Sequence, residues 1–488
     1  MANPHYQSAP VIVVAVPFPA QSHLNQMLQL SCLLSSCYNL PVHYVGSSIH
    51  IRQAKLRCST PLLLTRIQFR DLPIPPFPSP FPIRGGDTDF PAHLQPSFDS
   101  SLNLREPFAA LIDTLSSKAK KVVVIHDPLM AFAVQDSVSF PNVELYIFHT
   151  SSAFTSFSIL WERIQGIPVP NYFPENLPSM EGCLTNEVVN LITIHREFTK
   201  LRSGDLHNTC RVIEGEYIDH LAQNDSIVIE GEYLDHLAQN DKLRPRWAVG
   251  PLSHHLGGRI EEQSNSSGEN ICLIWLDKQP PKSVIYISFG TTSSFVKEQI
   301  KELAVGIEES KIKFIWVLRY ADRGDVFAEE DQSPELSEGF EERTEAQGMV
   351  VRGWVPQAEI LKHPSTGDFL SHCGWGSCLE SICSGVPIAA WPMHSDQPRN
   401  ATLVTQVLKI GLIVREWSHR EELITASAIK EALRTLMASE EGEMMRKRAE
   451  ELGRGVRQAT EEGGVSRKEL ESFINHISRS IHEQNKKT

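Results

Sequence analysis

Two residues in the first third of the chain could act together on a proton. His23 follows the apolar run 11–16, and Asp127 follows a second apolar run, 121–126. Continuous β-branched runs of this length are typical of strands buried on both faces of a parallel sheet. The carboxyl ends of parallel strands meet at one edge, so we expect Asp127 to orient the His23 imidazole as a general base. His126 is a weaker candidate, because adjacent strand residues point to opposite faces.

A glycine-rich turn in the second half has the features of a phosphate site. The sequence FLSHCGWGS, residues 369–377, ends a buried strand and leads into CLESIC, which we expect to form the first turns of a helix from Cys378. A strand that runs into a helix presents free backbone N–H groups and the positive end of the helix dipole. His372 and Ser377 can add side-chain donors.

Side chains on both sides of this turn could bind the other parts of a nucleotide sugar. Trp354, held by the following Val-Pro, offers a flat surface on which a base can stack. Gln357 and Glu380 can hydrogen-bond a ribose, while Asp396 and Gln397 bring a carboxylate and an amide to sugar hydroxyl groups. Base, ribose, diphosphate and hexose could therefore be bound in order.

The remaining sequence predicts an α/β protein of two domains that positions these groups. At 488 residues the chain is about three times the length of a typical domain. Strand-like and helical segments alternate in both halves, which is typical of βαβ units. The polar segment 253–270 is the expected linker between an N-terminal domain, 1–252, and a C-terminal domain, 271–465. A last helix, 466–488, either caps the second domain or crosses back to the first.

Composition argues against several partners. The net charge of −13 disfavours a nucleic-acid or anionic-membrane surface, and the early apolar run from Pro10 is too short to span a bilayer. Nine cysteines without a CxxC pair indicate reduced thiols, not a disulfide framework or a metal site. The sequence lacks GxGxxG after the first strand, a P-loop and GxSxG, which disfavours a dehydrogenase, a P-loop enzyme and a hydrolase. We expect a cytoplasmic monomer.

One segment occurs twice in succession. Residues 212–225 recur as 228–241 with a single difference, Ile218 against Leu234. One extra copy does not make a repeat protein. We expect the duplication to lie at the surface near the linker, because an extra copy in a core would displace the first.

The block from Trp354 to Gln397 resembles the signature box of the plant UDP-sugar-dependent glycosyltransferases, including its length of 44 residues. Segments such as VPFPAQSHLNQML and KAKKVVVIHDPLM resemble the zeatin O-glycosyltransferase branch of that family. The resemblance implies a GT-B fold, in which two Rossmann-like domains face each other across a cleft. It implies an acceptor bound mainly by the N-terminal domain and a nucleotide sugar bound by the C-terminal one. The implied reaction inverts the anomeric carbon and needs no metal or other cofactor.

The resemblance also assigns roles to single residues. His23 and Asp127 match the family's catalytic pair. Trp354 would stack on uracil, and His372 and Ser377 would lie on the diphosphate. The transferred sugar would be met by Trp375, Asp396 and Gln397. The residues expected to bind the UDP-sugar are Ser288, Gly290, Thr291, Trp354, Val355, Gln357, His372, Gly374, Trp375, Gly376, Ser377, Glu380, Asp396 and Gln397.

Gly376 departs from the family pattern, which usually has an asparagine or serine that reaches a phosphate oxygen. Losing that donor costs roughly 0.5–3 kcal/mol, depending on what replaces it. The backbone N–H groups remain, so we expect activity to be retained. Ser22, where the family usually has glycine or another small residue, is a smaller departure beside the base.

The resemblance favours transfer of glucose from UDP-glucose to a small hydroxylated acceptor, with a cytokinin such as zeatin preferred. UDP-xylose as donor, and flavonoid or terpenoid hydroxyl groups as acceptors, are alternatives within the same fold. A non-catalytic nucleotide-sugar binder is the distant alternative, and it has no need of His23 and Asp127. Candidate residues for the acceptor wall, each of which could equally belong to the core, are Phe18, Phe90, Leu94, Phe148, Phe154 and Phe157.

Overall fold

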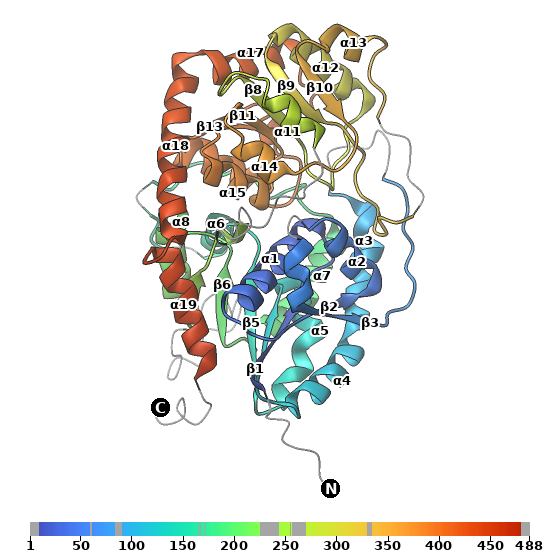
Figure 1. Ribbon diagram of the computed structural model, residues 1–488, viewed down its shortest axis with the longest axis vertical. Helices are drawn as coiled ribbons and strands as arrows, with labels where there is room; N and C mark the ends of the chain where they lie inside the picture. The colour runs from blue at the N-terminus through green and yellow to red at the C-terminus, as the bar shows by residue number, and fades with distance from the viewer. Residues whose placement is uncertain are drawn as a thin grey trace.

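The computed structural model describes residues 9–58, 61–82, 90–164, 167–170, 172–224, 244–253, 255, 270–328 and 334–479. Most of the expected linker and the second copy of the duplicated segment lie outside these ranges. The described chain forms two α/β domains, each built on a parallel sheet, stacked one above the other (Figure 1). The prediction of two α/β domains with parallel sheets is confirmed.

The N-terminal domain is built on a seven-stranded sheet in the order β3-β2-β1-β4-β5-β6-β7. Its strands are β1 (Ala9–Val16), β2 (Val42–Ser47), β3 (Ile67–Leu72), β4 (Ala119–His126), β5 (Val143–His149), β6 (Gly204–His207) and β7 (Arg246–Ala248). Its helices are α1 (Gln21–Cys37), α2 (Ser48–Leu56), α3 (Gln95–Ser100), α4 (Arg105–Ser116), α5 (Ala131–Val134), α6 (Ala153–Arg163), α7 (Asn186–Thr199) and α8 (Arg211–Gln223). On β1, Val13 and Val14 pack into different core clusters, since alternate residues face opposite sides of the sheet.

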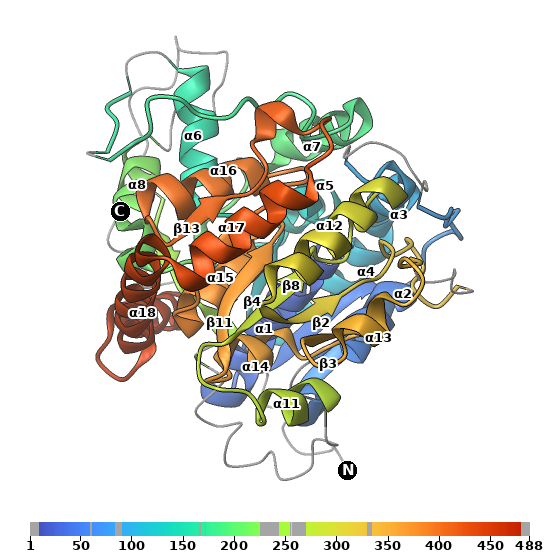
Figure 2. The same cartoon turned by 90° about the horizontal axis from the view of Figure 1, so that it is seen from above.

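The C-terminal domain is built on a six-stranded sheet in the order β10-β9-β8-β11-β12-β13. Its strands are β8 (Val284–Ser288), β9 (Lys313–Val317), β10 (Gly348–Val351), β11 (Thr366–Ser371), β12 (Ile388–Ala390) and β13 (Gly411–Ile413). Its helices are α11 (Ile271–Leu276), α12 (Lys297–Ser310), α13 (Phe340–Thr344), α14 (Gln357–Lys362), α15 (Trp375–Ser384), α16 (Gln397–Thr402), α17 (Ala426–Ala438) and α18 (Glu440–Thr460). Seen from above, α12 and α17 lie side by side over this sheet (Figure 2).

Both sheets reverse their strand order at a central pair, β1 with β4 and β8 with β11. Ligands of doubly wound sheets bind beyond the carboxyl ends of the strands at such a reversal, because the connecting helices leave there on opposite faces. The two expected functional groups follow these strands, one in each domain.

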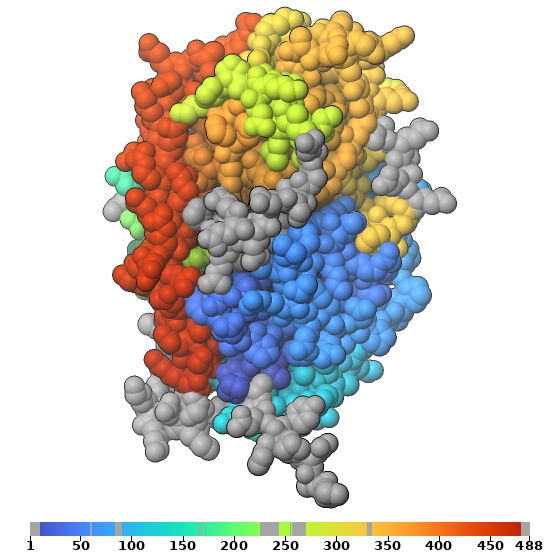
Figure 3. Space-filling model, in the orientation of Figure 1, coloured from blue at the N-terminus to red at the C-terminus, as the bar shows by residue number. Residues whose placement is uncertain are grey.

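The last helix, α19 (Val465–Ser478), crosses back to the N-terminal domain. Helices α18 and α19 run along one side of both domains (Figures 1 and 3). Leu470, Phe473 and Ile477 are fully buried in the same core cluster as residues of β1 and β5. The alternative that the sequence left open is thereby decided: α19 completes the core of the first domain.

Two local expectations differ from the structure. Helix α15 begins at Trp375, not at Cys378, because Gly374 is its N-cap and Trp375, Gly376 and Ser377 form the first turn. The first copy of the duplicated segment forms α8, whose apolar face is buried against α6, so this copy is part of the core and not a surface element. None of the helices in the described ranges combines the length and apolarity needed to cross a bilayer.

Candidate active site

The structure brings His23 and Asp127 together at the edge of the first sheet. His23 lies in the first turn of α1 after β1, and Asp127 follows the adjacent strand β4, in which His126 is level with Val16. The His23 Nδ1 atom lies 2.6 Å from Asp127 Oδ2. Asp127 is fully buried, whereas the His23 side chain is 26% exposed. The contact occupies Nδ1 and leaves Nε2 as the nitrogen that can face a substrate hydroxyl group.

Thr150, which the sequence reasoning missed, is the third member of this group. Its Oγ1 lies 3.0 Å from His23 Nδ1 and 3.5 Å from Asp127 Oδ2, at the end of β5. Burial lowers the pKa of the His23 imidazole, but attraction to Asp127, the hydrogen bond to it and a smaller attraction to Asp396 outweigh burial and raise that pKa above 6.5. The pair therefore stabilises the protonated imidazole that a general base becomes.

His126 does not compete with His23 for this role. It is 1% exposed, and its Nδ1–H donates to the backbone carbonyl of Asp127 at 2.8 Å. Burial lowers the pKa of its imidazole to about 4, so it is neutral and enclosed at neutral pH.

The turn before α15 has the geometry of an anion site. The backbone N–H groups of Trp375, Gly376 and Ser377 occupy the first turn of the helix, where they have no intrahelical partner. The His372 ring lies between two glycines: a Cβ atom at Gly290 or Gly374 would come within 2.6 Å of its Nε2. Glycine at these two positions lets the loop after β8 and the turn after β11 close around the imidazole.

His372 is a neutral donor at this turn. Burial lowers the pKa of its imidazole to about 4. Ser288 is the last residue of β8 and Thr291 lies in the loop that follows, where its carbonyl accepts from the backbone N–H of Asp322 at 2.7 Å. Backbone donors, helix dipole and imidazole can thus hold a diphosphate together.

The expected base and ribose positions lie next to this turn. Trp354 is 47% exposed. Gln357 Nε2 donates to Glu380 Oε2 at 2.8 Å and to Ser377 Oγ at 3.0 Å, so these three side chains form one group. Burial raises the pKa of Glu380, and the bond from Gln357 opposes that shift. Val355 is buried in the core, which leaves only its backbone for a ligand.

Trp375 differs from its expected place on the transferred sugar. Its side chain is 3% exposed, and its indole Nε1–H donates to the backbone carbonyl of Asn208 at 2.9 Å. The indole therefore fastens α15 to the N-terminal domain, and only the backbone N–H of Trp375 is available to a ligand.

Asp396 and Gln397 begin α16 on the other side of the turn. The Gln397 Oε1 atom accepts from the backbone N–H groups of Met393 and His394 at 2.8 and 3.1 Å, and its Nε2 lies 3.4 Å from His394 Nδ1. Burial raises the pKa of Asp396, while the bond from Asn400 and attraction to His23 lower it. Asp396, the carboxylate expected to bind the sugar, and His23, the expected base, thus lie near each other across the domain boundary.

Gly376 faces the N-terminal domain with room for a Cβ atom. The nearest atom to a Cβ built there is Gln26 Nε2 of the N-terminal domain, at 3.9 Å. An asparagine or serine side chain could begin at this position without a clash.

A cluster that the sequence did not reveal joins the domains beside Trp354. The Arg57 guanidinium pairs with Asp322 through both terminal nitrogens, with Nη2 2.8 Å from Oδ1, and lies 4.6 Å from the Trp354 ring centre. A pocket between the domains opens next to it and is lined by Pro19, Ala20, Gln21, Gln53, Leu94, Thr291, Thr292, Asp322, Arg323 and Gly324.

The candidate acceptor residues divide into two groups. Phe18 packs against the His23 ring with centroids 5.5 Å apart, and Phe90 reaches His394 of the other domain at 5.4 Å. Leu94 lines the pocket between the domains. The structure assigns the remaining three to the core, where they are fully buried: Phe148, Phe154 and Phe157.

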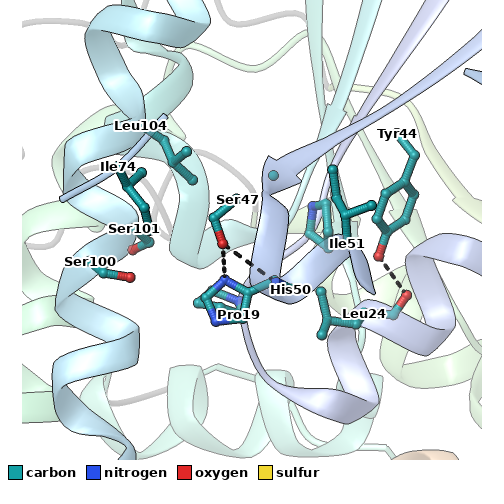
Figure 4. A pocket seen from close by; sticks show the side chains of 12 residues that line it. Pro19, Leu24, Tyr44, Ser47, His50, Ile51, Ile74, Ser100, Ser101 and Leu104 are labelled. Atoms are coloured by element: carbon teal, nitrogen blue, oxygen red, sulfur yellow. Dashed lines mark hydrogen bonds between the residues drawn. The ribbon is translucent and has the colours of Figure 1, made fainter. Parts of the chain in front are cut away.

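A narrow pocket lies beside the helix that carries His23 (Figure 4). Pro19 and Leu24, which flank His23 in the chain, form part of its wall. Ser47 Oγ lies 2.8 Å from His50 Nδ1 at its base, and Tyr44 donates to the Leu24 carbonyl at 3.0 Å. The free volume of this pocket is about 10 Å³, which is room for a water molecule, and His23 is not among the residues that line it.

Comparisons with known proteins agree with this geometry. Residues 9–227 match the family model "Glycosyltransferase, N-terminal domain", and residues 256–447 match "UDP-glucoronosyl and UDP-glucosyl transferase". The chain is 50% identical to zeatin O-glucosyltransferase of Phaseolus lunatus, over 96% of this chain and 97% of that protein. It is 48% identical to zeatin O-xylosyltransferase of Phaseolus vulgaris, over 96% and 98%.

A solved structure shows the same arrangement of domains. A Phytolacca americana glycosyltransferase bound to UDP-2-fluoro-glucose and pterostilbene superposes with a TM-score of 0.72 at 25% identity, over 97% of this chain and 100% of that one. The GT-B fold is therefore confirmed. Full-length identity of this size, together with both family models, shows that the chain belongs to the UDP-glycosyltransferase family and is a sugar-transferring enzyme.

Proposed function

We propose that this enzyme transfers glucose from UDP-glucose to a hydroxyl group of a cytokinin of the zeatin type, with inversion at the anomeric carbon. The observation that carries the proposal is the 2.6 Å contact between His23 and Asp127, placed at the sheet edge that faces the α15 turn. The acceptor class is supported by the names of the relatives, which include cis-zeatin O-glucosyltransferase 2 of Zea mays at 40% identity.

In this mechanism His23 Nε2 removes the proton of the acceptor hydroxyl as its oxygen attacks the anomeric carbon. Asp127 holds the imidazole and stabilises its positive charge. One in-line displacement inverts the anomeric carbon. The negative charge that develops on UDP is met by the first-turn N–H groups of α15 and by the neutral imidazole of His372, so the reaction needs no metal ion.

We assign the parts of the donor to the residues of the box in the same order. Trp354 stacks on uracil, Gln357 and Glu380 bind the ribose, and Asp396 and Gln397 bind the sugar hydroxyl groups. The diphosphate lies against the loop and turn formed by Ser288, Gly290, Thr291, His372, Gly374, Gly376 and Ser377.

UDP-xylose is the second candidate donor. The xylosyl-transferring relative is 48% identical and the glucosyl-transferring one 50%, a difference too small to separate the two donors. We further propose a cytoplasmic monomer; all nine cysteines are free thiols, which fits a reducing compartment.

The test is UDP release with trans-zeatin, cis-zeatin and several flavonols, each with UDP-glucose and UDP-xylose, and with the product mass determined. The proposal predicts a hexose adduct on a zeatin. A pentose adduct would select the second donor, and a flavonol adduct would overturn the acceptor class.

A variant separates catalysis from binding in the same assay. His23→Ala should lower turnover by about two to four powers of ten and leave UDP binding, measured by calorimetry, within about twofold. His363→Ala, which changes a histidine paired with Asp277 of the C-terminal domain, is the matched control and should retain turnover. Turnover of His23→Ala equal to that of the unmodified enzyme would reject His23 as the base. UDP binding without transfer to any acceptor would favour the non-catalytic alternative.

A further inference from the structure

Asn400 is a fully buried residue of α16 that none of the donor assignments uses. Its exposed fraction is 0%. Its Nδ2 donates to Asp396 Oδ2 and to the Cys373 carbonyl, both at 3.0 Å. Its Oδ1 accepts from Ser152 Oγ at 2.7 Å and lies 3.2 Å from Thr155 Oγ1. Every hydrogen-bonding position of this amide is therefore occupied.

The chemistry of these partners fixes the orientation of the amide. A carbonyl accepts only, and an ionised carboxylate accepts only, so the NH₂ group must face Cys373 and Asp396. The oxygen must then face the two hydroxyl groups, which can donate. A flipped amide would set an oxygen against two acceptors, at a cost of several unfavourable contacts in a buried site.

The two hydroxyl groups come from the other domain. Ser152 is the N-cap of α6, and its Oγ accepts from the backbone N–H of Thr155 at 3.1 Å. The Glu214 carboxylate accepts from the first two N–H groups of this helix, those of Ala153 and Phe154, at 3.1 and 2.8 Å. The start of α6 is thus held firmly from within the N-terminal domain.

Asn400 consequently links three parts of the enzyme. One side of its amide contacts the N-terminal domain, and the other contacts Asp396 and the turn that leads into α15. Cys373, whose carbonyl accepts the second bond, has a left-handed backbone with φ of 64°. Without the two hydroxyl groups of the N-terminal domain, the amide would be held from its NH₂ side alone, by Asp396 and the Cys373 carbonyl.

We propose that Asn400 is a positioning residue that holds Asp396 in its sugar-binding orientation, and that Ser152 and Thr155 of the opposite domain help to fix the amide that does so. The inference rests on the proposed role of Asp396 in binding the sugar. It means that binding of the sugar part of the donor depends on side chains of both domains through Asn400, whereas the UDP part does not depend on this contact.

The test compares the binding of UDP-glucose with that of UDP, which lacks the sugar, by calorimetry without acceptor. Asn400→Asp is nearly isosteric and keeps an acceptor for Ser152, but an oxygen replaces the group that donates to Asp396 and to the Cys373 carbonyl. We expect UDP-glucose to bind at least tenfold more weakly and UDP to lose clearly less affinity than UDP-glucose. Thr402→Ala is the matched control in the same helix, since its hydroxyl donates to the Pro398 carbonyl within that helix, and both affinities should stay within twofold.

A second variant tests the link from the other domain. Ser152→Ala combined with Thr155→Val removes both hydroxyl groups that donate to Asn400 Oδ1. It changes no residue of the C-terminal domain, to which the UDP-sugar is assigned. It should weaken UDP-glucose binding selectively, by about threefold or more, and its effect should not add to that of Asn400→Asp. Equal loss of UDP and UDP-glucose binding, or no loss of either in both variants, overturns the inference.

One further variant distinguishes this inference from the proposed function. If Asp396→Ala binds UDP-glucose as tightly as the unmodified enzyme, the assignment of Asp396 to the sugar is wrong. If Asp396→Ala loses UDP-glucose binding while Asn400→Asp does not, only the positioning role of Asn400 is wrong.

Discussion

Restoring an asparagine at position 376 should tighten donor binding. Gly376 lies in the first turn of α15, and the nearest atom to a new Cβ is Gln26 Nε2 at 3.9 Å, an ordinary van der Waals contact. The side chain therefore has room to begin, and it starts beside the backbone N–H groups that face the proposed diphosphate. Its amide NH₂ can donate to a phosphate oxygen.

The magnitude follows from the bond that would form. A hydrogen bond to a charged group contributes roughly 1.5–3 kcal/mol. Ordering the new side chain costs about 0.5–1 kcal/mol, and displacing a bound water can remove part of the gain. The net gain is then about 0.5–2 kcal/mol, which corresponds to roughly 2- to 30-fold tighter binding.

The assay is calorimetric titration of Gly376→Asn with UDP and with UDP-glucose. Both ligands carry the diphosphate, so both should bind more tightly by the same factor. Gly376→Ala is the control, because it makes the same change to the backbone without the amide. Equal affinities in the two variants, or weaker binding to Gly376→Asn, would refute the reasoning and show that the backbone N–H groups already satisfy the phosphate oxygen.

Three further predictions concern titration and stability. Only neutral His23 can accept a proton, and Asp127 raises the pKa of its imidazole. Asp127→Asn should therefore shift the acid limb of the pH–rate profile to lower pH and reduce kcat by about 10²–10⁴-fold. An unchanged acid limb would contradict this. Burial raises the pKa of Glu214 from 4.5 to about 7. As the pH rises, this carboxyl group therefore loses its proton in the unfolded chain before it does so in the folded one. The free energy of unfolding should accordingly fall by up to about 3 kcal/mol between pH 4.5 and about pH 7. Thermal unfolding of Glu214→Gln should lack this fall, and an identical pH dependence would disprove the link. Phe473→Ala should destabilise the fold by about 3–5 kcal/mol in urea unfolding, whereas a loss under about 1 kcal/mol would show that α19 contributes little.

Local sequence patterns predicted the parts of the site that lie at the ends of strands. His23 and Asp127 could be paired from sequence because parallel β-branched runs place their carboxyl ends at one edge. The turn at His372 could be recognised because a strand that leads into a helix exposes backbone donors. Neither inference required knowledge of how the two domains pack against each other.

The residues that were missed depend on contacts between distant segments. Asn400 and Ser152 belong to different domains, and no local sequence pattern predicts that their side chains form a hydrogen bond. The same holds for Arg57 with Asp322, and for the indole of Trp375, which bonds to Asn208 of the other domain instead of facing a sugar. Thr150 could have been suspected, because it follows β5, the strand next to β4.

Helix α19 makes the completion of the first domain depend on the end of the chain. Phe473 packs against Tyr146 and Trp247, at 5.4 and 5.1 Å between ring centres, so the core of the first domain includes residues translated after the entire second domain. On a ribosome, where domains usually fold as they emerge, the first sheet would wait with part of its apolar face uncovered until α19 arrives. That waiting intermediate is the species most exposed to aggregation, and the stage at which a chaperone would be of most use.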